Sequence, residues 1–181
     1  DFSERTLNYS LLTKYGTIHK SITLSAESYL HNHIYTINFD DIDQSNGFEL
    51  IWFGGLRPTE ERVEEDITYG SAIINQADEI EDIQSTDVNE IISRKVFNGN
   101  TNWAAVRTKY FLSAIIADEP GVFATLSSHN ISFGDRKHTP LYNASIGFPV
   151  DSNEISARIY LGPLDVDYMK DANSNLDVNC R

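Results

Sequence analysis

The stretch Thr17-Ile18-His19-Lys20-Ser21-Ile22-Thr23-Leu24 alternates between apolar and polar side chains, and a lysine is the one interruption of the apolar series. Residues 29–39 repeat the alternation after a turn-like segment at residues 25–28. Successive side chains of an extended chain point to opposite faces, so a period of two is typical of a strand buried on one side. Two β-strands are therefore expected here.

The same period recurs along most of the chain, and turn-forming residues separate the runs. Residues 98–100, with the sequence Asn-Gly-Asn, are one of the expected turns. Further strands are expected at Leu7–Thr13, Phe48–Phe53, Tyr69–Asn75, Glu79–Gln84, Glu90–Phe97, Tyr110–Ala117, Gly121–Leu126, Leu141–Phe148 and Glu154–Leu161. Roughly eleven short strands with frequent turns indicate an all-β sandwich or barrel.

Signals for helices are few. Thr59 follows a proline and precedes several acidic residues, which predicts a short helical segment over Thr59–Asp66. One or two helical turns are also expected over Ala104–Tyr110. Pro163 and the residues through Lys170 predict a C-terminal helix with the proline in its first turn, where the missing N–H has no cost.

Composition limits the classes of function. The chain has 181 residues, of which 40% are hydrophobic, and this fits one domain with a core of its own. It has 14 Lys and Arg against 27 Asp and Glu, and the resulting charge of −13 disfavours nucleic-acid binding. Apolar runs such as Ala114–Ala117 are far shorter than the roughly 20 residues of a membrane-spanning helix, so none is expected. The single cysteine, Cys180, cannot form an internal disulfide.

Two groups of polar residues are candidates for a catalytic or metal site. His31 and His33 lie two residues apart on an expected strand, so both rings share a face, as paired metal ligands do. Two partly packed histidines are the favoured alternative, because no third ligand stands at a matching place. The acidic run at residues 60–66 is favoured as a solvated face over an acid/base pair, which needs two carboxyls at a defined separation. We therefore assign no catalytic, metal-binding or cofactor-binding residue.

Two later phrases are more specific. The first, Asn102–Ile116, is expected to form a tryptophan-led turn that continues through Tyr-Phe into an apolar strand. The second, Ile159–Asp165, contains an aromatic residue followed after one position by Gly-Pro. Large aromatic side chains bury the greatest area, so Trp103 is expected in the core. The alternative is an aromatic groove that binds an extended apolar peptide.

As an ordered pair, these phrases resemble the extracytoplasmic domain of the YidC-type membrane protein insertases. The residues that carry the resemblance are Trp103, Lys109, Tyr110, Phe111, Tyr160, Gly162 and Pro163. Weaker similarity spans residues 17–175. The resemblance implies a non-enzymatic periplasmic domain of a bacterial inner-membrane protein, without cofactor or metal. It also implies a β-supersandwich of the galactose-mutarotase type with a short C-terminal helix.

The resemblance further implies partner docking and scaffolding during membrane protein insertion. The implied partners are accessory proteins of the Sec translocon, similar to SecDF, and nascent membrane proteins, whose extended segments the cleft of the domain would hold. Residues 1–181 are expected to form a single β-sandwich domain, as a fragment that lacks the first strands of the domain and the membrane segments. One departure from the family pattern concerns a proline. The family usually has it directly after the apolar strand, whereas here Ala117-Asp118-Glu119 precedes Pro120.

Two alternatives belong to other classes of protein. A carbohydrate-binding or aldose-epimerase-like sandwich would bring a histidine and a glutamate together in a cleft with exposed aromatic residues. A metal-dependent cupin would use His31 and His33 as ligands.

Overall fold

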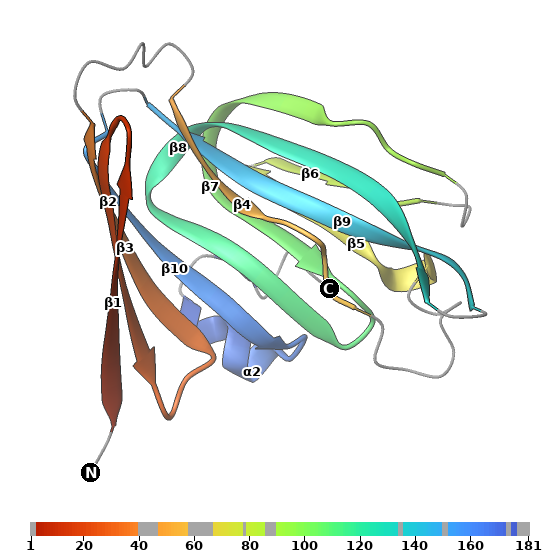
Figure 1. Ribbon diagram of the computed structural model, residues 1–181. Coiled ribbons are helices and arrows are strands. Elements are labelled where there is room, and N and C mark those ends of the chain that lie inside the picture. The colour runs from red at the N-terminus through yellow and green to blue at the C-terminus, as the bar shows by residue number, and fades with distance from the viewer. Residues whose placement is uncertain are drawn as a thin grey trace.

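Almost all regular structure in the computed structural model is antiparallel β-strand (Figure 1). The structure describes residues 3–39, 47–57, 67–77, 79–85, 90–133, 136–149, 152–172 and 175–176. The strands are β1 Glu4–Thr13, β2 Gly16–Ser25, β3 Leu30–Phe39, β4 Phe48–Trp52, β5 Ser71–Gln76, β6 Glu79–Ile83, β7 Lys95–Arg107, β8 Phe111–Phe133, β9 Arg136–Phe148 and β10 Glu154–Pro163. The helix α2 spans Val166–Met169, and a 3-10 turn, η1, spans Lys170–Ala172.

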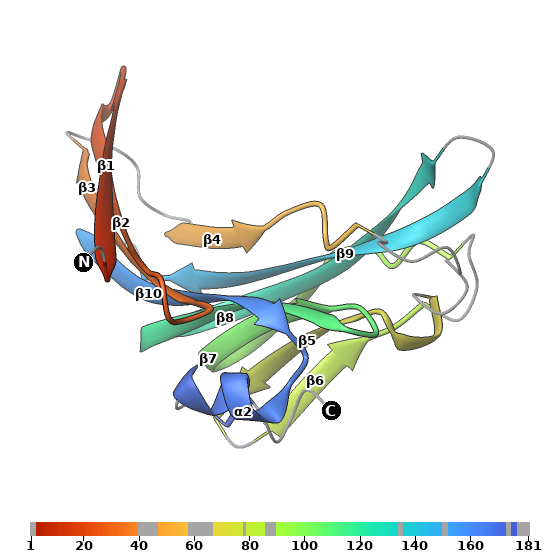
Figure 2. The same cartoon turned by 90° about the horizontal axis from the view of Figure 1, so that it is seen from below.

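The long strand β8 organises the sheet. Ten strands form one sheet in the order β1-β2-β3-β10-β8-β7-β5-β6, while β9 pairs with both β8 and β4. Residues 111–117 of β8 pair with β10, residues 123–133 pair with β9, and β7 runs along the opposite edge. The sheet therefore divides along β8 into a β10-β3-β2-β1 branch and a β9-β4 branch, and Figure 2 shows the first rising away from the second.

The centre of the sheet is buried on both faces. On β7, Trp103 and Ala105 belong to one hydrophobic cluster, whereas Ala104 and Val106 belong to the other. We call these the helix-side cluster and the cleft-side cluster. The helix-side cluster consists of Ile73, Trp103, Ala105, Leu112, Ala114, Ile116, Tyr160, Met169, Ala172 and Leu176. The cleft-side cluster includes Ile74, Ile115, Leu126, Tyr142, Ile146, Phe148 and Ile159. Burying both faces of a strand is typical of the centre of a layered fold.

A short C-terminal helix is present, as the sequence predicts, and it covers the helix-side face. It begins after Asp165, whose side chain accepts a hydrogen bond of 2.9 Å from the Asp167 backbone N–H and so caps the helix. Pro163 is the last residue of β10 and not the first residue of the helix, which corrects the predicted start. Arg158 of β10 ties the segment to the sheet, because its Nη1 donates to the Ala172 carbonyl at 2.9 Å.

Most predicted strands are confirmed, and two begin later than predicted. The predicted strands at the positions of β1, β2, β3, β4, β6, β9 and β10 match within a few residues. The predicted strand Tyr69–Asn75 begins only at Ser71, because residues 67–69 are helical. The predicted strand Glu90–Phe97 begins only at Lys95 and continues far beyond its predicted end.

Two predictions on β7 are wrong. The predicted helical turns over Ala104–Tyr110 are instead β-strand as far as Arg107, and Trp103 lies within the strand instead of leading a turn. Because both faces are buried, the apolar side chains do not alternate there and the strand period is lost. The predicted turn at residues 98–100 is a bulge inside β7, where the register with β8 shifts and Gly99 has a φ of 145°.

The predicted strands Tyr110–Ala117 and Gly121–Leu126 are one continuous strand, β8. Pro120 does not end it, because it lies after the last pair with β10, Ala117↔Ala157, and before the first pair with β9, Phe123↔Gly147. Proline is tolerated in a strand where no ladder hydrogen bond is required of it. The predicted helix Thr59–Asp66 lies outside the described part of the chain, and so does Cys180.

Candidate functional site

An apolar hollow lies between the two branches of the sheet, and we call it the cleft. Its volume is about 500 Å³. One wall is the concave face of the β1–β3 branch, where Leu7, Ile22 and His33 stand side by side in one row of the ladder. Its lining comprises Leu7, Lys20, Ile22, Leu24, His31, His33, Tyr35, Glu49, Leu50, Ile51, Trp52, Ile115, Ile159 and Leu161. Figure 2 shows the two branches facing one another across this region.

Strand β4 forms the opposite wall of the cleft, and its unpaired edge faces the cleft. In the described part of the chain β4 pairs with β9 alone, so its other edge has no neighbouring strand. The four consecutive residues Glu49–Trp52 all line the cleft. Side chains of a strand alternate between faces, so four consecutive lining residues indicate that the strand edge, with its backbone N–H and C=O groups, is what faces the cleft.

A polar cluster fixes β4 in place. The Glu49 carboxylate accepts hydrogen bonds from the hydroxyls of Thr125, at 3.1 Å, and of Ser145, and these two hydroxyls lie 2.6 Å apart. Arg94 completes the cluster with an ion pair of 3.2 Å to Glu49. Hydrogen bonds to a charged group are stronger than neutral ones. The cluster therefore ties β4 to both β8 and β9, and it holds the cleft edge in a fixed position.

The two predicted histidines do share a face, and both line the cleft. His33 Nδ1 lies 3.2 Å from the Tyr35 hydroxyl. Burial, assisted by the positive charge of Lys20 and by electrostatic repulsion from a protonated His31, lowers the pKa of His33 to about 4, and burial lowers the pKa of His31 as well. Both rings are therefore neutral at neutral pH. Among the described residues, no group of three or more His, Cys, Asp and Glu could hold a metal.

A glutamate, Glu49, lines the cleft on the wall opposite the two histidines, and the carbohydrate alternative requires a glutamate and a histidine that converge. Glu49, however, is occupied by Arg94 and the two hydroxyls described above. Its oxygens therefore already accept hydrogen bonds from β8, β9 and Arg94. Sequence reasoning missed Glu49 because its partners are 76 and 96 positions away, and no local pattern links them.

The residues that carry the family resemblance divide into buried and exposed groups. Trp103 has no exposed surface and Tyr160 is 1% exposed, and both belong to the helix-side cluster. The Tyr160 hydroxyl donates to the Pro163 carbonyl at 2.7 Å. Burial, together with neighbouring Tyr29 and carboxylates, raises the pKa of Tyr160 to about 12. The expectation that Trp103 lies in the core is met.

The two phrases meet in the sheet. Phe111 pairs with Pro163, and Leu112 pairs with Gly162, so β8 and β10 place them side by side. Together with Tyr29, Leu56, Arg57, Thr108 and Leu161, these residues line an apolar pocket of about 420 Å³. A Cβ on Gly162 would lie 2.8 Å from the ring of Tyr29, so glycine allows that ring to pack against the strand. We call this hollow the β10-end pocket.

Lys109 and Tyr110 lie in the turn between β7 and β8, next to this pocket. The Lys109 ammonium stands over the rings of Tyr69 and Tyr110, at 5.5 and 4.9 Å from their centroids. The Tyr110 carbonyl accepts a hydrogen bond of 2.7 Å from the Leu164 N–H, which fastens the turn to the end of β10. These two residues are therefore surface residues with a defined geometry.

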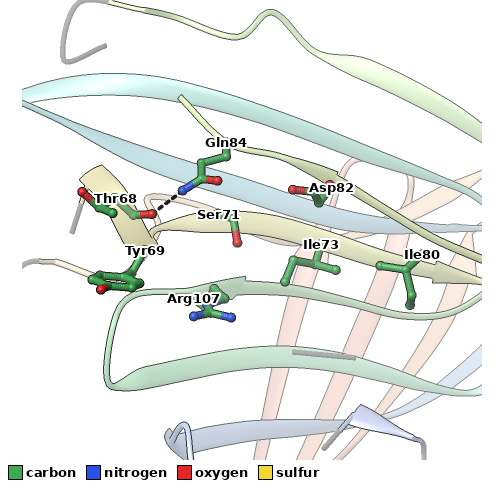
Figure 3. Close-up of a pocket in the computed structure, with 8 residues that line it drawn as sticks. All are labelled: Thr68, Tyr69, Ser71, Ile73, Ile80, Asp82, Gln84 and Arg107. Carbon is green, nitrogen blue, oxygen red and sulfur yellow. Dashed lines mark hydrogen bonds between the residues drawn. The ribbon is translucent and has the colours of Figure 1, made fainter. Parts of the chain in front are cut away.

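A third hollow, of about 270 Å³, is polar and lies near β6 (Figure 3). Ser71 and Ile73 of β5, Asp82 of β6 and Arg107 of β7 line it, and the Gln84 amide donates to the Thr68 carbonyl at its rim. Figure 3 shows groups of both charges on its sides. Such a lining can accept small polar groups, but it has no arrangement of nucleophile and base. No helix within the described residues has the length and apolar character required to span a membrane.

Comparison with known proteins agrees with the resemblance. A model of the YidC periplasmic domain family matches residues 4–179. The membrane protein insertase YidC of Chloroherpeton thalassium is 27% identical over 143 residues, which are 77% of this chain and 24% of that protein. The insertase of Chlorobium limicola is 30% identical over 146 residues, 77% of this chain and 24% of that protein. For Prosthecochloris aestuarii the identity is 26% over 160 residues, 86% of this chain and 27% of the insertase.

The chain thus spans about a quarter of the length of the curated relatives that it matches. The family match covers every strand from β1 to β10 and the C-terminal helix. The chain therefore belongs to the family of YidC periplasmic domains, a non-enzymatic family whose place is the periplasmic side of the bacterial inner membrane.

Proposed function

We propose that this domain is a docking and scaffolding module of a membrane protein insertase, and that the cleft holds an extended apolar segment of a partner. The observation that carries the proposal is the unpaired edge of β4 opposite the apolar wall of the β1–β3 branch. The relatives are named membrane protein insertase YidC, so substrates of the whole protein would be nascent membrane proteins. Such chains expose apolar segments before they enter the bilayer.

The geometry of the cleft supports binding by strand addition. A segment that pairs with β4 would satisfy the backbone groups along Glu49–Trp52 and would present alternate side chains to the opposite wall. Leu7, Ile22 and Leu24 are the apolar contacts available there. Backbone pairing supplies affinity without regard to sequence, and the apolar wall supplies preference for hydrophobic residues. This combination suits substrates that share hydrophobicity rather than a motif.

The partners are proposed to include accessory proteins of the Sec translocon, similar to SecDF, in addition to nascent chains. Residues 1–181 are proposed to act as a single domain, and the bent ten-stranded sheet is compatible with one part of a β-supersandwich. The residues Trp103 and Tyr160 are proposed as structural members of the family motif, because both are buried. Lys109, Tyr110, Phe111, Gly162 and Pro163 are proposed to act at the surface.

A photocrosslinking residue in the full-length insertase tests the cleft. Leu7 and Leu12 lie on opposite faces of β1 and are 43% and 81% exposed, and only Leu7 lines the cleft. A crosslinker at position 7 is expected to capture nascent membrane protein or a Sec accessory protein, while the same crosslinker at position 12 captures neither. Equal capture at both positions, or none at position 7, would contradict the proposal.

A charge variant offers an independent check with the same pair of residues. Leu7→Glu places a carboxylate on the apolar wall, and it is expected to reduce insertion of a YidC-dependent substrate and crosslinking from a second cleft position, Ile22. Leu12→Glu adds the same charge to the same strand outside the cleft and is expected to behave as the parent. If both variants insert substrate normally, the cleft does not contribute to the function.

A further inference from the structure

One end of the molecule gathers five exposed aromatic residues. The register places the β2–β3 turn, the end of β10 and the start of β8 together, because Tyr160 pairs with Leu30 and Pro163 pairs with Phe111. The helix α2 follows at the same end, and Figure 1 shows it below the sheet. The tip of the β1–β2 hairpin lies at the opposite end of its branch.

Five aromatic side chains at this end are each between 42% and 50% exposed. We call them the aromatic end, and they are Tyr29, Tyr69, Tyr110, Phe111 and Tyr168. Direct contacts connect them: the rings of Tyr29 and Tyr168 meet edge to face at 5.1 Å, and Tyr29 and Phe111 line the β10-end pocket together. Lys109 stands over Tyr69 and Tyr110, which brings the remaining two rings into the group.

Cations accompany these rings. Arg57 is the one charged residue among the nine that line the β10-end pocket, and Lys109 lies in the adjacent turn. Among the described residues that line it, the β10-end pocket has a cation and no carboxylate, in a chain with a net charge of −13. Carboxylates flank this end on Glu27 of the β2–β3 turn and on Asp165 and Asp167 of α2, where Asp167 pairs with Lys170. The rings rather than the net charge therefore dominate its chemistry.

We propose that the aromatic end rests in the headgroup layer of the membrane that faces the domain. Tyrosine combines an apolar ring with a polar tip and is enriched at membrane–water interfaces for that reason. Lysine and arginine side chains extend along apolar surface and place their charges among lipid headgroups. A lipid surface also fits the arrangement of the rings, which come from separate turns and surround an open pocket. The proposal depends on the family placement and not on the role of the cleft.

The opposite end provides a matched contrast. The β1–β2 hairpin also exposes apolar side chains near its tip, namely Leu11, Leu12 and Tyr15, of which Leu12 is the most exposed. This group is mainly aliphatic and lies across the branch from the aromatic end. Nonspecific hydrophobic adsorption to a membrane would involve both ends of the domain, whereas an oriented membrane contact involves only one.

A polarity-sensitive fluorophore on a single cysteine tests the proposal on residues 1–181. The label is placed at Tyr110→Cys or Leu12→Cys, each in a Cys180→Ser background, and vesicles of phosphatidylglycerol with phosphatidylethanolamine are added. Emission at position 110 is expected to shift to the blue and to be quenched by lipids with a quencher near the headgroup, while position 12 remains in water. No change at position 110, or the same change at both positions, would overturn the proposal.

Substitutions separate the rings from the charge. The double substitution Tyr110→Ser with Phe111→Ser is expected to weaken binding both to these vesicles and to neutral phosphatidylcholine vesicles, and Val122→Ser, an exposed position in the middle of β8, has no effect. Lys109→Gln is expected to weaken binding to the anionic vesicles about five-fold and to leave the neutral ones unchanged. Unaltered binding by the double variant would overturn the proposal, as would a response that requires an added protein. Neither result bears on Leu7 and the cleft.

Discussion

The two hydrophobic clusters differ in what covers them. The helix-side cluster is closed by α2, η1 and Leu176, and its members Trp103, Leu112 and Met169 are at most 1% exposed. The cleft-side cluster is closed at the centre of the sheet but continues into the cleft, where Leu7 of β1 and Ile51 of β4 are exposed. One face of the sheet therefore serves mainly to hold the fold, while the other leaves apolar surface available for a partner.

The same division separates the family motif. Trp103 and Tyr160 point to the closed face, whereas Phe111 and Pro163, from the same two phrases, line an open pocket. A motif of this kind is a mixture of core positions and surface positions. Substitution of the first kind should change stability, and substitution of the second kind should change binding with little loss of stability.

The largest effect is expected from Trp103→Ala. Removing this fully buried side chain should lower the free energy of unfolding by about 3–5 kcal/mol, because the cavity cannot be filled by its neighbours. Urea denaturation followed by circular dichroism measures the change. Phe53→Ala is the control, since Phe53 is 77% exposed and should change stability by less than about 0.5 kcal/mol. Equal effects of the two substitutions would remove the distinction between the closed and open faces.

A smaller loss is expected from Gly162→Ala, at the border between the two regions. Its Cβ would lie 2.8 Å from the Tyr29 ring and 2.9 Å from the Tyr160 hydroxyl, so both rings must move, at a cost of about 1–3 kcal/mol. Thermal unfolding measures the loss. In a Tyr29→Ala background the same substitution should cost less, because the clash with the Tyr29 ring is gone, while the contacts with Cβ of residue 29 and with the Tyr160 hydroxyl remain. A cost that does not depend on Tyr29 would show that the β10-end pocket is not shaped by this contact.

Glu49→Gln should have an effect of about 1 kcal/mol, because the amide keeps one oxygen for the hydroxyls and loses the ion pair to Arg94. The more informative measurement is hydrogen exchange, which should become faster in the amides of β4. Glu4→Gln, on the exposed strand β1, is the control and should leave β4 unchanged. If β4 exchanges at the same rate in both variants, the polar cluster does not fix the edge of the cleft.

Local pattern determined how much of the fold could be predicted. Strands with one buried face, such as β2 and β3, alternate in sequence and are placed correctly. The centre of β7 fails because Ala104-Ala105-Val106 contacts both clusters, so its side chains do not alternate and the alanines favour a helix. The β8 prediction fails at Pro120, whose tolerance depends on a gap between two partner strands that lie elsewhere in the sequence.

The candidate site could be predicted only in part. The shared face of His31 and His33 follows from their spacing, and both do line the cleft. The cleft itself is lined by residues of β1, β2, β3, β4, β8 and β10, and β4 reaches it only because it pairs with β9 almost a hundred residues later. The alignment of such distant strands is a property of the whole sheet, and no local period in the sequence encodes it.

A pH dependence that belongs to the open face alone is also expected. The pKa of His33 is about 4 in the folded domain and 6.5 in the unfolded chain, so the unfolded chain binds more protons between these values. Stability is therefore complete above pH 6.5, falls as the pH is lowered toward 4 and is not lost further by this group below that. Because the ring is partly exposed, the slope should stay below about 1.4 kcal/mol per pH unit. Urea unfolding at a series of pH values should show that His33→Asn removes this part of the decline in stability.

The control is His19→Asn, on the outer face of β2, which should retain the decline. A peptide bound in the cleft should make the decline steeper, because it buries the His33 ring further. Identical pH profiles for His33→Asn and the parent would mean that solvent reaches the ring freely, and the wall of the cleft would then be more open than the packing of His33 against Tyr35 indicates.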